Sequence, residues 1–229
     1  MAPRPNTALE AKIDRHVLAQ LKAVPLAPDR PLIVVDCDEV MVALASHLGR
    51  FVAGLGIEMR LERYQLEGAF RDPETGRRLD FQEALGLIHR FFSEETERQE
   101  AIDGAAAALS RLAERAQIVV LTNVPRHARE ARIRNLDALG MGYPLVENSG
   151  GKGRALAWLA ERVGPTLPTA FIDDSPGQIE SAAQRAPRVR RVQFTGAPGL
   201  AGLLPAAKEA DHRVASWAAL EALLARHLG

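Results

Sequence analysis

The stretch PLIVVDCDEV, from Pro31 to Val40, indicates both the fold and the place of the chemistry. Four apolar residues rich in Ile and Val, led in by a proline, predict a buried strand of a parallel sheet. Ligands bind at the carboxyl ends of such strands, which is where Asp36 stands. If the extended backbone continues for two residues, Asp36 and Asp38 point to the same side, because side chains alternate along a strand. Two carboxylates in one pocket favour a divalent cation or acid/base chemistry.

The composition is that of an ordinary globular protein. With 229 residues, 47% of them hydrophobic and 25% charged, the chain can form one domain with an insertion or two small domains. Lys plus Arg and Asp plus Glu both number 29, so no net charge attracts a nucleic acid polymer or an anionic membrane. The single cysteine, Cys37, excludes an internal disulfide and a cysteine-based zinc site. The amino end lacks a signal-peptide pattern, and we expect a cytoplasmic protein.

Apolar strands alternate with helical patterns along most of the chain, which predicts a doubly wound, Rossmann-like α/β fold with a parallel sheet. After a helix over residues 8–23, strands are expected over 31–35, 117–122, 144–146, 170–173 and 191–195. Helices are expected over 105–115, 126–139, 152–163, 178–185 and 217–228.

Residues 43–100 interrupt this alternation, because they show helical periodicity and no convincing strand. Five of the seven phenylalanines lie there, enough for a small separate core. The clearest helix begins at Asp80, whose side chain can cap the backbone while Glu83 reaches back. We therefore expect a catalytic core formed by residues 1–42 and 101–229, and a helical cap formed by residues 43–100.

Three further stretches place polar residues at expected strand ends or at a helix start. QIVVLTN ends at Thr122 and Asn123, GGKGRAL opens a helix at Lys152, and AFIDDSP contains Asp173 and Asp174. Each signal alone is weak, because turns and helix caps use the same residue types. Four of them in order on alternating elements predict a functional site at one edge of the sheet.

These four stretches, in this order, resemble the motif set of the haloacid dehalogenase-like superfamily, most of whose members are magnesium-dependent phosphatases. The resemblance covers residues 31–42 and 102–195, and the insertion stands where that family carries a helical, C1-type cap. It implies an enzyme that hydrolyses a small phosphorylated metabolite. A dehalogenase lacks the second aspartate in that family's pattern, so Asp38 favours phosphoryl transfer.

The resemblance also assigns roles to the four aspartates. Asp36 is the nucleophile that forms an aspartyl-phosphate intermediate, and Asp38 is the general acid/base. A divalent cation removes the repulsion between a phosphate and an anionic nucleophile, and hard oxygen ligands suit Mg²⁺. Its ligands are expected to be Asp36, the backbone carbonyl of Asp38, Asp174, and Asp173 in an assisting role.

The phosphoryl oxygens are expected to be bound by the remaining motif residues. Lys152 supplies a point charge and the Thr122 hydroxyl a neutral donor, with backbone N–H groups of Asn123 and Glu39 as further donors. Glu39 departs from the family's commonest form, which has glycine there, and this bears on substrate access. The glycine-rich run around Lys152 lacks the spacing of a nucleoside-triphosphate loop.

Other polar residues are interpreted as structural. The charged stripe after Asn123 is expected to be a solvated helix face, and Cys37 a small core residue. The stripe comprises Arg126, Arg129 and Arg132. Polar residues of the insertion that could touch a substrate, none of them ranked as a site, are His47, Tyr64, Arg71 and His89.

Two other function classes stay open. A phosphomutase of the same superfamily would use the same residues. A non-catalytic phosphoacceptor or ligand-binding module is the other class, although receiver domains place their lysine after the last strand and lack a helical insertion. The substrate, the specificity-determining residues of the cap, the role of the first 30 residues, and the choice between a monomer and a homodimer are not fixed by the sequence.

Overall fold

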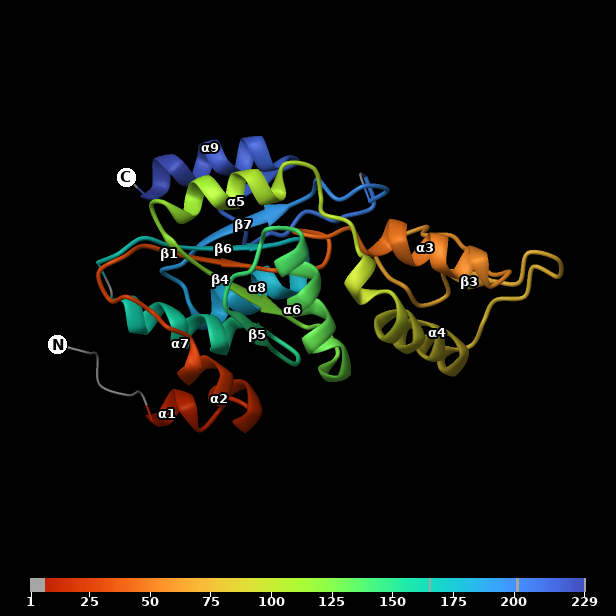
Figure 1. Ribbon diagram of the computed structural model, residues 1–229, viewed down its shortest axis with the longest axis horizontal. Coiled ribbons are helices and arrows are strands. Elements are labelled where there is room, and N and C mark those ends of the chain that lie inside the picture. Colours follow the sequence, from red (N-terminus) through yellow and green to blue (C-terminus); the bar gives the residue numbers. More distant parts are fainter. Residues whose placement is uncertain (1–6, 165, 201, 229) are drawn as a thin grey trace.

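A six-stranded parallel sheet forms the centre of the molecule in the computed structural model, which describes residues 7–164, 166–200 and 202–228 (Figure 1). The strand order is β5-β4-β1-β6-β7-β8, and every neighbouring pair in this sheet is parallel. The predicted doubly wound fold is thereby confirmed. The strands are Leu32–Val35 (β1), Gln117–Thr122 (β4), Leu145–Glu147 (β5), Thr169–Asp173 (β6), Arg190–Phe194 (β7) and His212–Val214 (β8).

Helices cover both faces of this sheet because its inner strands are apolar on both sides. In β1, Ile33 and Val35 belong to one apolar cluster with α5, α6 and α9, whereas Leu32 and Val34 belong to a second with α2, α7 and α8. Figure 1 shows α5 and α9 above the sheet and α7 below it. The helices are Thr7–Glu10 (α1), Arg15–Ala23 (α2), Ala105–Ala113 (α5), Arg129–Ala138 (α6), Gly153–Val163 (α7), Pro176–Arg185 (α8) and Trp217–Leu228 (α9).

The strand order creates a switch point beside β1. From β1 the chain adds β4 and β5 on one side, and then β6, β7 and β8 on the other. Ligands of open α/β sheets bind at such a point, beyond the carboxyl ends of the strands. Val35 pairs with Ile172, and the Asp36 N–H donates to the Ile172 carbonyl at 2.9 Å, so Asp36 and Asp173 leave neighbouring strands at the same level.

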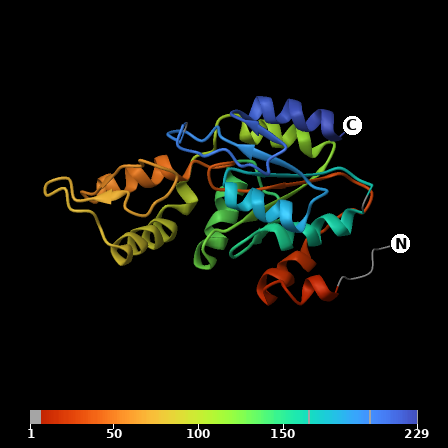
Figure 2. The ribbon, with the colours of Figure 1, turned by 180° about the vertical axis from the view of Figure 1, so that it is seen from behind.

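The insertion between β1 and α5 stands to one side of the sheet in both views (Figures 1 and 2). It contains α3 (Leu44–Gly54), α4 (Phe81–Glu94), the 3-10 turn η1 (Thr96–Arg98), and an antiparallel pair formed by β2 (Glu58–Met59) and β3 (Phe70–Arg71). The expectation of no strand here was wrong, since strands of two residues are too short to leave an alternating pattern. Phe91 and Phe92 pack with Val124 and Ala128, so the insertion shares an apolar cluster with the turn after β4.

Three local details complete the comparison with the sequence. The capping box of Asp80 and Glu83 is confirmed at the start of α4. The expected helix over 8–23 is two helices, because Asp14 begins α2 anew by accepting from the N–H groups of His16 and Val17. The strand β8 was missed. In the described ranges, no helix has both the length and the apolar character needed to cross a lipid bilayer.

Candidate active site

Three buried carboxylates, those of Asp36, Asp173 and Asp174, converge at the carboxyl ends of β1 and β6. One oxygen of each lies within 4.8 Å of the others. Burial raises the pKa of Asp36 to about 7, and the Asp173 carboxylate adds to the rise. Burial, together with the carboxylates of Asp173 and Asp36, raises the pKa of Asp174 well above its usual value. A divalent cation would relieve this repulsion, and an all-oxygen set of hard ligands is the kind that Mg²⁺ takes.

Lys152 lies inside this carboxylate cluster, with a relative exposure of 1%. Its Nζ is 2.6 Å from Asp36 Oδ1 and 2.7 Å from Asp173 Oδ2. Burial alone would lower the pKa of Lys152, but the two carboxylates outweigh it and raise that pKa. The ammonium group therefore stays charged inside the cluster.

The packing of α7 on α8 holds Lys152 in place. A Cβ on Gly153 would come within 2.0 Å of the Ser181 carbonyl oxygen, so only glycine allows the two helices to approach this closely. The Gly153 N–H donates to Ser181 Oγ at 3.0 Å, and the Lys152 N–H donates to Gln178 Oε1 at 2.8 Å. The two helices thus fix the backbone from which the lysine reaches the carboxylates.

The second aspartate of the first motif, Asp38, does not share the carboxylate cluster. The backbone bends at Cys37, whose carbonyl accepts from the Met41 N–H at 2.7 Å, so the extended geometry ends at Asp36. The Asp38 side chain instead pairs with Arg132, at 2.7 Å between Oδ1 and Nη2, and keeps 17% of its surface exposed. The condition for a shared pocket, an extended backbone from Asp36 to Asp38, is therefore not met, and Asp38 lies outside the group of three carboxylates.

The environment of Arg132 differs from the one that the sequence predicts. Its side chain is fully buried, whereas the stripe of arginines after Asn123 was expected to be solvated. Arg126 is exposed, as expected, and donates to His16 at 3.1 Å. Arg129 is half-buried and donates to Gln20 at 3.1 Å. Cys37 lies in the core, and its burial raises the pKa of the thiol, which fits the predicted structural role.

Glu39 occupies a backbone position that favours glycine. Its φ of 62° lies in the left-handed region, which explains physically why glycine suits this position. The Glu39 side chain is buried, and Oε1 accepts from the Ala45 N–H at 2.5 Å. Burial raises the pKa of Glu39 to about 8. This carboxyl group therefore joins the loop that carries Asp36 to the first turn of α3 in the insertion.

Thr122 ends β4, next to β1, and Asn123 follows it, as expected. The buried Thr122 hydroxyl accepts from the Val124 N–H at 3.1 Å, which leaves its hydrogen to donate to a ligand oxygen. The exposed Asn123 amide donates to the Gly150 carbonyl at 2.9 Å and accepts from Asn148 at 2.9 Å. Asn123 thus ties the loop after β4 to the loop that leads to Lys152.

The insertion contributes one side chain to the cluster, that of Tyr64. Its hydroxyl donates to Asp174 Oδ2, and burial together with this carboxylate raises the pKa of Tyr64. The sequence offered Tyr64 only as one of four polar residues. The other three make contacts elsewhere: His47 binds Glu95 at 3.0 Å, Arg71 binds Glu62, and the His89 ring lies 5.5 Å from that of His127.

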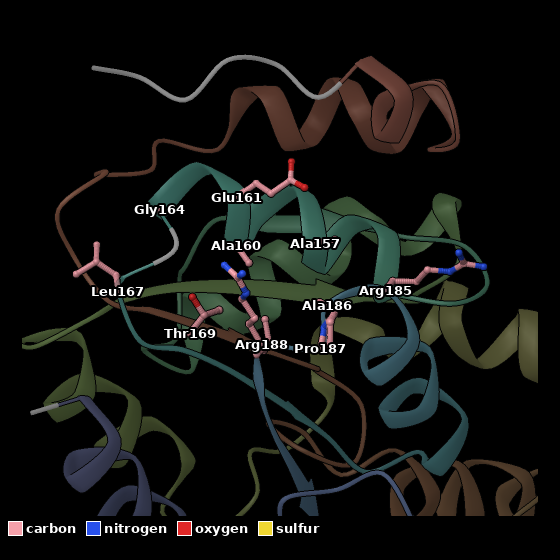
Figure 3. A pocket seen from close by; sticks show the side chains of 11 residues that line it. Ala157, Ala160, Glu161, Gly164, Leu167, Thr169, Arg185, Ala186, Pro187 and Arg188 are labelled. Carbon is pink, nitrogen blue, oxygen red and sulfur yellow. The ribbon is translucent and has the colours of Figure 1, made fainter.

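A separate cavity of about 360 Å³ lies far from this chemistry. Figure 3 shows its lining, from the last turns of α7 to the turn after α8. It includes Thr169, the first residue of β6, so it opens at the amino end of the strand whose carboxyl end carries Asp173. Without a cluster of carboxylates or a buried lysine, this cavity has no comparable chemistry.

Comparisons with solved structures identify the fold. No protein-family model and no curated protein sequence matches the chain. A HAD family hydrolase of Deinococcus radiodurans with bound phosphate and sodium aligns with a TM-score of 0.58 and 19% identity, over 88% of this chain and 97% of the other. A putative HAD-hydrolase of Bacillus subtilis bound to magnesium aligns with a TM-score of 0.58 and 15% identity, over 86% of this chain and 99% of the other. A putative phosphoglycolate phosphatase of Lactobacillus plantarum aligns with a TM-score of 0.54 and 16% identity, over 85% of this chain and 99% of the other. The fold is that of the haloacid dehalogenase-like hydrolases, as the motifs predicted.

Proposed function

We propose that this chain, which has the fold of the haloacid dehalogenase-like hydrolases, is a Mg²⁺-dependent phosphatase of that superfamily. Its substrate is a small phosphorylated metabolite. The observation that carries the proposal is the buried set of three carboxylates around one buried lysine. Such a set accepts a divalent cation and a phosphoryl group together. Neighbouring folds with bound phosphate and with bound magnesium support it.

In the proposed reaction, Asp36 is the nucleophile. Its carboxylate attacks phosphorus, the bond to the alcohol oxygen breaks, and an aspartyl-phosphate forms. Lys152 already holds Asp36 and Asp173 through two of its three N–H donors, and the third can bind a phosphoryl oxygen together with the Thr122 hydroxyl. Bound Mg²⁺, held by Asp36, Asp173, Asp174 and the Asp38 carbonyl, would neutralise charge on the phosphate.

Asp38 is the proposed general acid/base. Its partly exposed carboxyl group gives a proton to the departing alcohol oxygen, and then removes a proton from the water that hydrolyses the intermediate. The two steps use one group in both directions, so the products are the alcohol and inorganic phosphate, and Asp36 returns to its initial state. A mutase would transfer the phosphoryl group back to the substrate instead; this alternative stays open.

Residues 43–100 are the proposed cap, with the C1-type placement between β1 and α5. The contact of Tyr64 with Asp174 brings the cap onto the cluster, and the shared packing with Val124 and Ala128 supports the same arrangement. The cap then limits the access of bulk water while leaving room for the water that hydrolyses the intermediate. The cytoplasmic setting, the absence of nucleic acid and membrane partners, and the homodimer stay predictions.

The test is phosphate release from a panel of phosphomonoesters, with Mg²⁺ and with a chelator, for the wild type and for Asp36→Asn. We expect turnover that requires Mg²⁺ and falls by at least about a thousandfold in the variant, because the nucleophile is lost. A matched control is Asp137→Asn, at an exposed position of α6 away from the cluster. Metal-independent turnover, or equal rates for Asp36→Asn and the wild type, would refute the proposal.

A further inference from the structure

Arg132 joins three side chains in a largely buried network. Its Nη2 donates to Asp38 Oδ1 at 2.7 Å and to Gln99 Oε1 at 2.6 Å, and its Nη1 donates to Asn135 Oδ1 at 3.0 Å. Arg132 has no exposed surface. A buried guanidinium requires a charged or strongly polar partner, and here one such partner is the carboxyl group of the proposed acid/base.

One of the other two partners of Arg132, Gln99, belongs to the linker that leads from the insertion back to the core, and the second, Asn135, lies on α6 itself. Gln99 directly follows η1, in the segment that leads to α5. The Asn135 amide donates to the Gln99 carbonyl at 2.8 Å and to the Glu97 carbonyl at 3.2 Å. One guanidinium group therefore contacts both the carboxyl group of Asp38 and the returning linker.

The outgoing linker of the insertion lies against the same place. Val42 forms a bridge with Asp38 and an antiparallel bridge with Ala101, so both linkers run side by side next to Arg132. Gln99 lies between the insertion and the core, so a shift of the returning linker would move Gln99 relative to Asp38. Such a shift would lengthen or break the hydrogen bond between Arg132 and Gln99.

The network also keeps unused donors. Within the described ranges, Arg132 Nε and Gln99 Nε2 are buried and have no hydrogen-bond partner. A network that served packing alone would be expected to satisfy such groups, because an unpaired buried donor costs free energy. Unused donors beside a hinge are consistent with a second arrangement of the same side chains.

We propose that Arg132 is a positioning residue, which holds Asp38 where it reaches the leaving oxygen only when the returning linker of the insertion is seated. This inference rests on the proposed phosphatase function and deepens it. Arg132 itself contacts no substrate. Its effect is confined to the step in which Asp38 gives a proton to the departing oxygen, so it scales with how much the leaving group needs that proton.

A comparison of two substrates of nearly the same shape distinguishes this effect from a general loss of catalytic activity. Phenolate is a basic leaving group, with a conjugate acid near pKa ~10 like that of tyrosine, and it needs a proton as it departs. The 4-nitrophenolate ion is stabilised by its nitro group and needs far less help. The ratio of kcat/KM for 4-nitrophenyl phosphate to that for phenyl phosphate therefore measures the contribution of the acid.

The experiment compares the intact wild type with Arg132→Lys, Arg132→Gln and Asp38→Asn, all with Mg²⁺. Arg134→Gln is the matched control, because Arg134 lies on the same helix and binds Glu97 of η1, next to the linker, but on the surface. Thermal unfolding and circular dichroism check that each variant is folded. Arg132→Lys keeps the charge and is the milder change if Arg132→Gln does not fold.

We expect the kcat/KM ratio to rise about tenfold or more in the Arg132 variants and in Asp38→Asn, and to stay within about twofold in the control. The double variant Asp38→Asn with Arg132→Lys should show no further rise, since both changes act on one group. Equal losses for the two substrates in a folded Arg132 variant, or loss of folding in both Arg132 variants, would overturn the inference. A wild type that hydrolyses neither aryl phosphate nor any panel substrate would overturn the proposed function itself.

Discussion

Replacing Lys152 with methionine removes the positive charge between two buried carboxylates while keeping much of the side-chain volume. The lysine lies 2.6 Å from Asp36 and 2.7 Å from Asp173, and it is 1% exposed. Removing one partner of a buried ion pair costs about 3–5 kcal/mol, because the remaining charge has no compensation. We expect the free energy of unfolding of the metal-free protein at pH 8 to fall by about this amount.

The cost should depend on pH. Without the lysine, the raised pKa of Asp36 rises further, so the carboxyl group takes up a proton at low pH and avoids part of the cost. Urea unfolding in the presence of a chelator, followed by circular dichroism at pH 5.5 and pH 8, measures both values. Adding Asp36→Asn to Lys152→Met should recover about 1–3 kcal/mol at pH 8, because one of the repelling charges of the cluster is then absent.

Lys22→Met is the control, because Lys22 pairs with Glu10 on the surface and is half-exposed. It should change stability little, as exposed ion pairs generally contribute little. A loss below about 1 kcal/mol for Lys152→Met at pH 8, with no dependence on pH and no recovery in the double variant, would refute the reasoning that Lys152 neutralises the cluster.

The remaining predictions concern the metal, the cap and the helix contact. In the absence of metal, the free energy of unfolding should decrease as pH rises from about 4 toward the folded pKa of about 7 for Asp36, because the folded state holds a proton that the unfolded state releases. Saturating Mg²⁺ should reverse this trend. Urea unfolding at several pH values measures both, and a free energy that does not change with pH in the absence of metal would contradict the prediction. Tyr64→Phe frees the Asp174 oxygen from a hydrogen bond and should tighten Mg²⁺ binding up to about tenfold in calorimetry, whereas weaker binding would show that the hydroxyl supports the ligand. Gly153→Ala places a methyl group against the Ser181 carbonyl and should lower the free energy of unfolding by about 1–3 kcal/mol or more, with a loss of phosphatase activity; a stable and active variant would contradict the packing argument.

The sheet and the position of the carboxylate cluster could be predicted from the sequence because they depend on local patterns. The run Leu32–Val35 is apolar on both faces, and this is typical of an inner parallel strand. Strand order then places Asp36 beside Asp173, and Lys152 reaches both because a glycine follows it. The order of the motifs along the sequence was sufficient to predict the position of the cluster, because each motif residue directly follows a strand or opens a helix.

The environments of Arg132 and Tyr64 could not be predicted in the same way. The arginines of α6 share one helical spacing, which does not say which of them turns toward the linker of the insertion. The contact of Tyr64 with Asp174 depends on how the insertion packs on the core, a long-range property with no pattern in the sequence. The bend at Cys37, which separates Asp38 from Asp36, is closed by a local hydrogen bond from the Met41 N–H and leaves no periodic pattern in the sequence.

Phosphoryl transfer to Asp36 can be measured by mass spectrometry of protein quenched in acid during turnover. Asp38→Asn is the best form for this measurement, because 4-nitrophenyl phosphate needs little acid to react, whereas hydrolysis of the intermediate needs the base. We predict a gain of one phosphoryl group that maps to Asp36, requires Mg²⁺ and disappears when Asp36→Asn is added. Turnover of the substrate by the wild type with no phosphoryl group on Asp36 in either form would contradict the proposed mechanism.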